Sequence, residues 1–377
     1  MIEPNNSLYE SLSRVLKNYI NDFDAQDYTI QQYPQGHIHQ SYVVVHRNTP
    51  RYFLQRINSK VFLDIKQVTS NHKLLYDYID KMKSGIIRLA KPVSLLGSNE
   101  WYYWDEQGYA WRMVHYYTTH HSHQTCPSHQ TAAQAGLAFG AYSNMLNTPS
   151  IHRKPLNLQP TIAKFHSIAW RLEQYQQAQS SYSGPTRIPY EPSQRLKNNP
   201  TFFDLTDLDT ILESYSQTFL NMETELAASH VQNPRLAHND TKLNNVLLST
   251  ENEPPIIIDL DTTMPGSILF DLGDGLRTIG LTEAEDQTDI TLLHLNQDYY
   301  TAFREAFINQ VASLFSPTEH AFVSLAGPYM AYIMGLRFLT DFLNENTYYA
   351  IQYPTHNLIR SRNQFHLLHL MMEEANG

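Results

Sequence analysis

The sequence predicts an α+β protein of two lobes, in which a small lobe built on an antiparallel sheet precedes a larger helical lobe. Up to about residue 117, β-branched and aromatic runs alternate with turn compositions, which is typical of antiparallel strands. Beyond that point, apolar residues recur mostly at helical spacing. The 377 residues, of which 42% are hydrophobic, exceed one typical domain and allow a sizeable core. We therefore expect a division into 1–117 and 118–377.

The small lobe is expected to contain a helix, a hairpin, a second helix and a second hairpin. Residues 1–22 carry Leu, Val and Tyr at helical spacing. The runs SYVVVH and RYFLQRI, separated by the turn composition RNTP, predict the first hairpin. Residues 61–82 have helical periodicity, and the runs WYYWDEQ and YAWRMVHYY predict the second hairpin, with Gly108 in its turn.

The larger lobe is expected to begin with an Ala-rich helix over residues 130–146 and to be mostly helical from about residue 280 to the end. The segment 174–200 is rich in Gln, Ser and Pro. This bias predicts a long loop or a partly ordered insertion.

Composition excludes several classes of function. Lys and Arg total 27 against 37 Asp and Glu, a formal net charge of −10, whereas proteins that bind nucleic acids usually have the opposite balance. The single cysteine, Cys126, rules out an intramolecular disulfide. We find no signal-peptide core and no apolar run of the ~20 residues that a membrane-spanning helix needs. We expect a cytoplasmic protein, monomeric or homodimeric, that acts on a small molecule, with no nucleic-acid or membrane partner.

One segment, LAHNDTKLNNVLLSTENEPPIIIDLD at 236–261, concentrates polar groups at fixed offsets. Phosphoryl transfer from a nucleotide needs a carboxylate that orients the attacking hydroxyl, oxygen ligands for Mg²⁺ and a cation that offsets charge. The spacing places Asp240 and Asn245 on one loop, and Asp259 ends the apolar strand that follows. Lys242 supplies the cation.

The order His-x-Asp-x-Lys-x-x-Asn resembles the catalytic loop of protein kinases, and HND with IIDLD is more similar to the aminoglycoside phosphotransferase and choline kinase branch. Within this branch, HNDTKLNNVL, IIDLDTTMPGSILFDLGDGLR and GLRFLTDFL, with the paired YFLQRIN and VFLDI, resemble N-acetylhexosamine 1-kinases. The resemblance covers residues 36–364. It implies a protein-kinase-like two-lobe fold with ATP and Mg²⁺ as cofactors, a nucleotide-binding lobe at 1–117, and a catalytic and acceptor-binding lobe at 118–377.

The resemblance also implies roles for single residues. Asp240 would be the catalytic base that orients the sugar hydroxyl, and Lys242 would contact the γ-phosphate. Asn245 and Asp259 would ligate Mg²⁺, and Asp261 would add a metal contact or accept backbone donors. The residues expected to hold this loop against the helical lobe are Asp271, Asp274 and Arg277.

The nucleotide is expected between the lobes, with its phosphates beneath the segment YPQGHIHQSYVV and its adenine near the connector at 114–117. Kinases carry a Lys on the third strand, where this sequence has Gln55 and then Arg56. Strand alternation puts these two on opposite faces, so only one can point at phosphate. The expected nucleotide contacts are Gly36, His37, Gln55, Arg56, Val114 and Tyr116.

The acceptor is expected to lie in the helical lobe beside Asp240, with Arg337, Tyr348 and His166 as further contacts. An Arg can hydrogen-bond sugar hydroxyls or an acetamido carbonyl in a fixed fork, and a Tyr can pack on the sugar ring. Two alternatives stay open. The acceptor could be another sugar or a choline-like amino alcohol, or the missing third-strand Lys could indicate a catalytically silent nucleotide-binding module.

Overall fold

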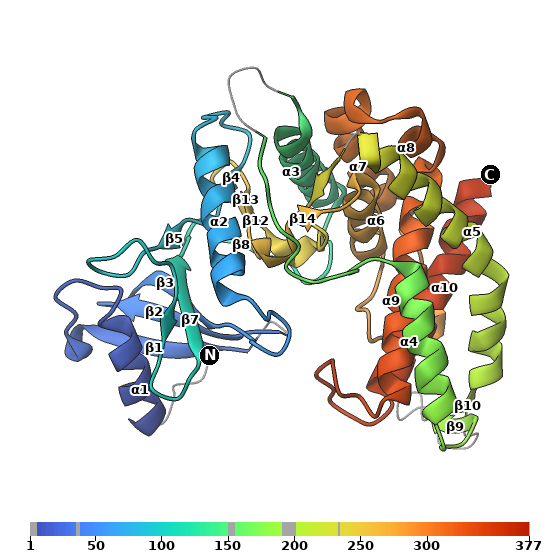
Figure 1. The fold of residues 1–377 in the computed structure, drawn as a ribbon, viewed down its shortest axis with the longest axis horizontal. Coiled ribbons are helices and arrows are strands. Elements are labelled where there is room, and N and C mark those ends of the chain that lie inside the picture. Colours follow the sequence, from blue (N-terminus) through green and yellow to red (C-terminus); the bar gives the residue numbers. More distant parts are fainter. Residues whose placement is uncertain (1–5, 35–37, 150–154, 191–200, 233, 377) are drawn as a thin grey trace. The chain divides into compact units, whose positions relative to one another are not determined.

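A computed structural model of the chain describes residues 6–34, 38–149, 155–190, 201–232 and 234–376 (Figure 1). The chain forms two compact units. The sheet unit comprises Met1–His121, Pro149–Ala163 and Leu247–Met264, and the helical unit comprises Ser122–Thr148, Lys164–Val246 and Pro265–Gly377. The expected α+β class, with an antiparallel sheet in one lobe and helices in the other, is confirmed.

The main sheet of the sheet unit contains both predicted hairpins. Its antiparallel strands run in the order β1 (Tyr28–Tyr33), β2 (Gln40–His46), β3 (Thr49–Arg56), β7 (Ala110–His115) and β5 (Pro92–Val93), and β6 (Tyr103–Trp104) also pairs with β7. The predicted hairpins are β2–β3 and β6–β7. Gly108 stands in the second turn with φ +79°, a conformation that glycine adopts without strain.

Two helices flank the strands of this unit. Helix α1 (Asn6–Leu16) buries Leu12 and Leu16 in a core that includes Val44 and Leu54 of the sheet. Helix α2 (Ile65–Asp80) begins at Asp64, whose carboxylate accepts a hydrogen bond from the Gln67 backbone N–H at 2.8 Å.

A smaller sheet in the same unit presents the acidic end of the predicted motif. Its strand order is β4 (Arg88–Leu89), β13 (Ile256–Ile257), β12 (Val246–Ser249) and β8 (His120–His121). Both Ile residues of β13 have no exposed surface, so this strand is a fixed base for the residues that follow it. Asp259 comes two residues after β13.

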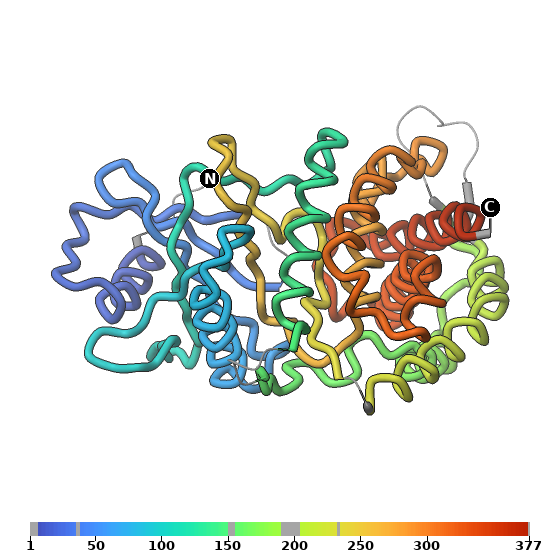
Figure 2. Tube along the Cα trace, turned by 90° about the horizontal axis from the view of Figure 1, so that it is seen from above, coloured from blue at the N-terminus to red at the C-terminus, as the bar shows by residue number. Residues whose placement is uncertain are grey.

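The helical unit is organised around α9 (Ala326–Leu343), which is buried along most of its length. Helix α10 (His356–Asn376) and α6 (Ile268–Ile279) pack against α9, and α3 (His129–Asn147) lies alongside α7 (Gln297–Val311) in both ribbon and tube views (Figures 1 and 2). The remaining α-helices are α4 (Ile168–Ser181), α5 (Leu205–Gln232) and α8 (Pro317–Ala321).

The prediction of a loop over 174–200 is wrong at its start. Helix α4 continues to Ser181, and β9 (Arg187–Tyr190) pairs with β10 (Thr201–Asp204), while residues 191–200 lie outside the described part of the chain. Gln is a good helix former, and Tyr175 and Ala178 give α4 a buried face. Compositional bias therefore concealed an amphipathic helix.

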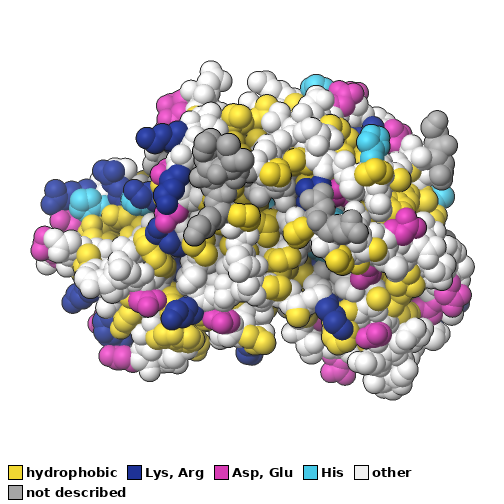
Figure 3. All heavy atoms as spheres, turned by 45° about the horizontal axis from the view of Figure 1, so that its top comes forward, with side chains coloured by type: hydrophobic (Ala, Val, Ile, Leu, Met, Phe, Trp, Pro, Cys, Tyr) yellow, Lys and Arg dark blue, Asp and Glu magenta, His cyan; other side chains and the backbone are white. Residues whose placement is uncertain are grey.

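Charge is divided unevenly between the units. In the sheet unit, basic and acidic residues are equally numerous, so the net charge of −10 belongs to the helical unit. On the face of the molecule that Figure 3 presents, Lys and Arg side chains gather over the sheet unit. Among the described residues, no helix is both long and apolar enough to cross a bilayer.

Candidate active site

The loop at 238–245, the candidate catalytic loop, brings together three of the predicted residues. The loop follows β11 (Leu236–Ala237) and closes in the 3₁₀ turn η3 (Leu243–Asn245). Lys242 Nζ lies 2.9 Å from Asp240 Oδ2, and Asn245 Nδ2 donates to the same oxygen at 2.7 Å. Burial by itself would raise the pKa of Asp240, but Lys242 and the hydrogen bond from Asn245 hold that pKa below its ordinary value. Asp240 is therefore an ionised carboxylate at neutral pH.

Asp271 of α6 anchors this loop through the backbone. Its carboxylate accepts hydrogen bonds from the backbone N–H groups of His238 at 2.9 Å and Asn239 at 2.7 Å, and from Ser143 Oγ at 3.0 Å. Asp271 has no exposed surface, and burial raises its pKa to about 6 despite these donors. The expectation that Asp271 holds the loop is confirmed by these contacts.

The acidic turn after β13 holds the other two predicted carboxylates. Asp259 has φ 56° in the left-handed region, which Asp tolerates better than most residues, and Asp261 lies in the 3₁₀ turn η4 (Leu260–Thr262). Asp261 is 1% exposed and accepts from His39 Nε2 at 2.9 Å and from Arg112 Nη1. Burial would raise the pKa of Asp261, but Arg112 and His39 hold it well below its usual range.

Asp259, Asp261 and His39 form a group that could hold a metal ion, with their ligand atoms within 4.8 Å of one another. His39 Nδ1 accepts from the Asn58 backbone N–H at 3.1 Å, so the neutral ring carries its proton on Nε2 and donates it to Asp261. His39 is thus a hydrogen-bonding support rather than a ligand. Carboxylate oxygens are the ligands that Mg²⁺ prefers, so the acidic turn fits that ion.

On β3, Gln55 and Arg56 have separate environments. Gln55 Oε1 accepts from Arg112 Nε at 3.0 Å, whereas the Arg56 guanidinium lies 4.1 Å from the centre of the Tyr109 ring. Arg112, on β7, was not predicted as a site residue. It is 5% exposed and connects Gln55 to Asp261, which gives the acidic turn a buried cation. The signal in the sequence was a lone charged residue within an apolar strand, AWRMV.

The remaining predicted nucleotide contacts stay predictions. Val114 pairs with Phe53 and Pro92 within the main sheet, and the Tyr116 backbone N–H donates to the Arg51 carbonyl at 2.9 Å. Gly36 and His37 lie outside the described residues.

The predicted acceptor residues lie in the helical unit. His166 Nε2 donates to the carbonyl of Asn239 at 2.9 Å, which places the ring next to the catalytic loop. Burial, and then Arg337, lower the pKa of His166 to about 3, so the ring is neutral.

The Arg337 guanidinium lies 4.9 Å from the ring centre of Phe165 and 5.7 Å from that of Tyr349. Tyr348 is 49% exposed and contacts the Tyr349 ring edge-on, so among the described residues the rings recorded against Arg337 are those of Phe165 and Tyr349.

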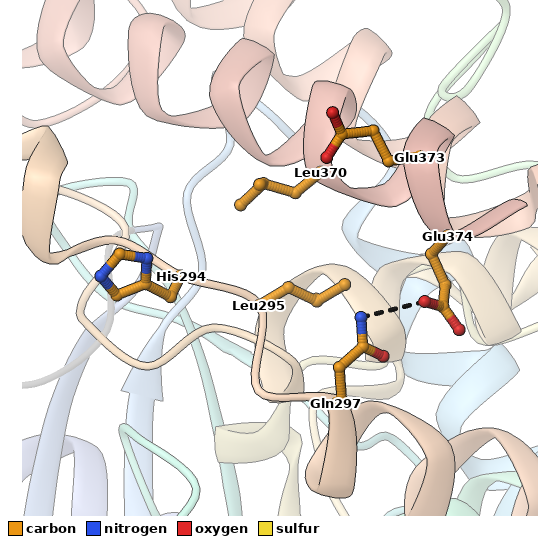
Figure 4. Close-up of a pocket in the computed structure, with 6 residues that line it drawn as sticks. All are labelled: His294, Leu295, Gln297, Leu370, Glu373 and Glu374. Atoms are coloured by element: carbon orange, nitrogen blue, oxygen red, sulfur yellow. Dashed lines mark hydrogen bonds between the residues drawn. The ribbon is translucent and has the colours of Figure 1, made fainter. Parts of the chain in front are cut away.

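A cavity of about 410 Å³ opens elsewhere on the helical unit, where α10 meets the segment before α7 (Figure 4). The Gln297 amide donates a hydrogen bond to Glu374 at 3.0 Å, drawn as a dashed line in Figure 4. None of the residues that line the cavity belongs to the predicted site, and we assign it no part in catalysis. They are His294, Leu295, Gln297, Leu370, Glu373 and Glu374.

Comparison with known proteins identifies both fold and family. One similar solved structure is a microcompartment-associated aminopropanol kinase, with 10% sequence identity, a TM-score of 0.61 and 97% of each chain covered. A second is a spectinomycin phosphotransferase in complex with ADP and spectinomycin, with 13% identity, a TM-score of 0.57, and 96% of this chain and 97% of that chain covered. A third is a choline kinase from Cryptosporidium parvum Iowa II, with 13% identity, a TM-score of 0.54, and 98% of this chain and 96% of that chain covered. The expected kinase-like two-lobe fold is confirmed. The profile of the phosphotransferase enzyme family (APH) matches residues 29–306, and the chain belongs to this family.

Proposed function

We propose that this phosphotransferase is an ATP- and Mg²⁺-dependent kinase that phosphorylates the anomeric 1-hydroxyl of an N-acetylhexosamine. The observation that carries the proposal is the ionised Asp240, held by Lys242 and Asn245 on a loop that Asp271 anchors. A positioned carboxylate beside a cation is what phosphoryl transfer to a hydroxyl requires.

Each residue has a defined task in this proposal. Asp240 accepts a hydrogen bond from the acceptor hydroxyl, orients it for attack, and takes its proton as the new bond forms. Lys242 offsets negative charge on the transferred group. The amide nitrogen of Asn245 is committed to Asp240, so its oxygen is the atom that would bind the metal, together with Asp259. Mg²⁺, when bound, neutralises charge on the triphosphate.

A buried cation supports an active kinase over a silent nucleotide-binding module. The third-strand position that holds Lys in protein kinases is Gln55 here, and Gln55 accepts from Arg112. Arg112 therefore provides the sheet unit with a permanently charged group next to the acidic turn.

The surroundings of Arg337 support a sugar over an amino alcohol. Two of the similar structures are named as kinases of choline and aminopropanol, and cationic ligands of this kind bind against aromatic ring faces. In this chain the rings of Phe165 and Tyr349 already face the Arg337 guanidinium. An ammonium group there would meet a like charge, whereas sugar hydroxyls and an acetamido carbonyl would receive hydrogen bonds.

Replacing the catalytic base tests the chemistry. We expect Asp240→Asn to lower kcat by roughly 10²–10⁴, because an amide cannot accept the proton. ATP consumption in the presence of N-acetylglucosamine measures the effect. The matched control is Asp207→Asn, an exposed position on α5, which should keep its activity. An Asp240→Asn enzyme with normal turnover would show that the base has been misassigned.

An acceptor panel tests the substrate. ³¹P NMR of ATP with N-acetylglucosamine, N-acetylgalactosamine, choline, or no acceptor should show a sugar 1-phosphate only with the hexosamines. Phosphorylation of choline alone would replace the proposed acceptor and leave the kinase assignment intact. If Mg-ATP raises the melting temperature but no acceptor is phosphorylated, the silent-module alternative is correct.

A further inference from the structure

The surroundings of Arg337 contain several buried polar atoms that lack hydrogen-bond partners among the described residues. They are Arg171 Nε, His166 Nδ1 and Tyr349 Oη. All three side chains interact electrostatically with Arg337. Buried polar atoms are rarely left unsatisfied in folded proteins, so a cluster of them indicates a group that completes the site.

This cluster also has a net positive charge. Within the part of the chain that the structure describes, neither Arg171 nor Arg337 forms an ion pair with a carboxylate, whereas Arg235 and Arg277 of the same unit pair with Glu319 at 3.1 Å and with Asp274 at 2.8 Å. Among the described residues, the Arg171 guanidinium donates to two neutral groups, the Gln174 side chain at 2.7 Å and the Phe165 carbonyl at 3.0 Å. Burial, and then repulsion by Arg337, lower the pKa of Arg171 to about 10.

Among the described residues, the carboxylates near this cluster have other partners. The nearest in sequence to Arg337 is Asp341, which accepts hydrogen bonds from the backbone N–H groups of Tyr348 at 2.8 Å and Tyr349 at 3.0 Å. Asp240, which interacts electrostatically with His166, pairs with Lys242 at 2.9 Å. Glu285, which interacts with Tyr349, pairs with Arg277 at 2.5 Å. Arg337 is buried and Arg171 is half-buried. Two neighbouring guanidinium groups in such surroundings without a counter-ion are unfavourable, and an anion that binds both removes that cost.

We propose that Arg171 and Arg337 form an anion subsite in the acceptor pocket, so that the acceptor is a hydroxyl compound bearing a carboxylate or a phosphate. This inference rests on the proposed function and narrows it to an N-acetylhexosamine with an acidic substituent. Arg171 is a specificity-determining residue in this assignment. The neutral His166 offers Nδ1 as an acceptor for a hydroxyl of the same ligand.

Matched acceptors and variants test the subsite. The acceptors are N-acetylglucosamine and its derivatives with a carboxylate-bearing ether or a phosphate ester at ring positions 3, 4 or 6. The variants are Arg171→Gln, Arg171→Lys and the exposed control Arg187→Gln in the same unit. We expect the wild type to prefer at least one acidic derivative by about tenfold or more in kcat/KM, the size of a charge-assisted hydrogen bond.

Arg171→Gln should raise the KM for the acidic derivative by about 10- to 100-fold and lower kcat/KM for the neutral parent by a clearly smaller factor. The KM of Arg171→Lys for the acidic derivative should lie between those of the wild type and Arg171→Gln. The KM of Arg187→Gln should equal that of the wild type. Calorimetric titration of the acidic derivative without nucleotide should show the same loss of affinity. That measurement separates binding of the acceptor from any contact with the transferred phosphate.

Each contrary result has a distinct meaning. Equal kcat/KM for neutral and acidic acceptors in the wild type, or an equal loss for both in Arg171→Gln, overturns the anion subsite and leaves the proposed function standing. A change confined to the KM for ATP also overturns it, because the pair would then serve the nucleotide. Failure of every hexosamine as a substrate overturns the proposed function itself.

Discussion

Arg112 and His39 each donate to one carboxylate oxygen of Asp261, and this division assigns different tasks to the two acids of the turn. With both oxygens engaged by the protein, Asp261 shapes the turn and keeps a buried negative charge in place. We therefore propose Asp259 as the metal ligand. The same two donors explain why the pKa of Asp261 lies well below its usual range, in spite of burial.

Replacing Arg112 in its ion pair with Asp261 should lower the free energy of unfolding. In Arg112→Met, Asp261 keeps a buried charge without its partner, and breaking a buried ion pair typically costs about 3–5 kcal/mol of unfolding free energy. We expect a lower midpoint in urea unfolding and a higher Mg²⁺ concentration for half-maximal activity. Arg112→Lys should recover part of the stability and part of the Mg²⁺ affinity, because lysine restores the positive charge but lacks the two-pronged donor geometry of a guanidinium. If Arg112→Met shows wild-type stability and the wild-type Mg²⁺ requirement, Arg112 does not support the acidic turn.

At the scale of elements, the close approach of α3 and α7 depends on glycine. A Cβ atom at Gly140 would lie 2.7 Å from the Phe307 carbonyl oxygen, a backbone atom that cannot move without shifting α7. Alanine favours a helix over glycine by about 1 kcal/mol. Overpacking typically costs about 1–3 kcal/mol, and the steric effect should outweigh the propensity.

We therefore expect Gly140→Ala to lower the melting temperature. Gln134→Ala, at an exposed position on the same helix, should stay within about 0.5 kcal/mol of the wild type. Differential scanning calorimetry on both variants makes the comparison. A Gly140→Ala protein that melts at a higher temperature than the wild type would mean that α3 and α7 can separate at little cost.

Elements with a strong local pattern could be predicted from the sequence, and contacts between distant segments could not. The β2–β3 hairpin, α2 and α3 follow from periodicity and turn composition. The hydrogen-bonded group in the candidate catalytic loop could be predicted because its residues are close in sequence, with Asp240 and Asn245 five positions apart. Helix α4 was missed because its Gln-rich composition outweighed, in our prediction, the spacing of Tyr175 and Ala178.

The residues that sequence reasoning missed act across long separations. Arg112 meets Asp261 from a strand 149 positions earlier, and Arg171 is near Arg337 only because α4 packs on α9. No spacing rule relates such pairs. What the sequence did offer was a charged residue inside an apolar strand, and that signal alone does not name the partner.

At the scale of the whole molecule, the chain returns to the sheet unit twice after first leaving it. The segments 149–163 and 247–264 belong to this unit, and the second of them carries the acidic turn. A single cut after residue 117 cannot represent this arrangement. Asp240 and Asp259 therefore belong to different units, although only 19 positions separate them in the sequence.

Buried histidines should make the stability of both units depend on pH. His72 of the sheet unit donates to the Ala90 carbonyl at 2.8 Å, and burial lowers its pKa to about 4. Burial, followed by Arg337, lowers the pKa of His166 in the helical unit to about 3. Both rings are neutral in the folded protein and take up a proton in the unfolded chain below about pH 6.5. The unfolded state thus binds more protons between pH 6.5 and the folded pKa, so stability rises with pH across that window.

We expect the free energy of unfolding to be highest near pH 7 and to fall as the pH is lowered to 4, with each histidine contributing at most about 1.4 kcal/mol per pH unit. His72→Gln and His166→Gln can keep the hydrogen bond but cannot titrate, so each should flatten the pH dependence. Urea unfolding, followed by near-ultraviolet circular dichroism at several pH values, measures this. If the units unfold in separate transitions, each variant should flatten only the transition of its own unit. An unchanged slope in both variants would show that these histidines take up protons equally in the folded and the unfolded protein.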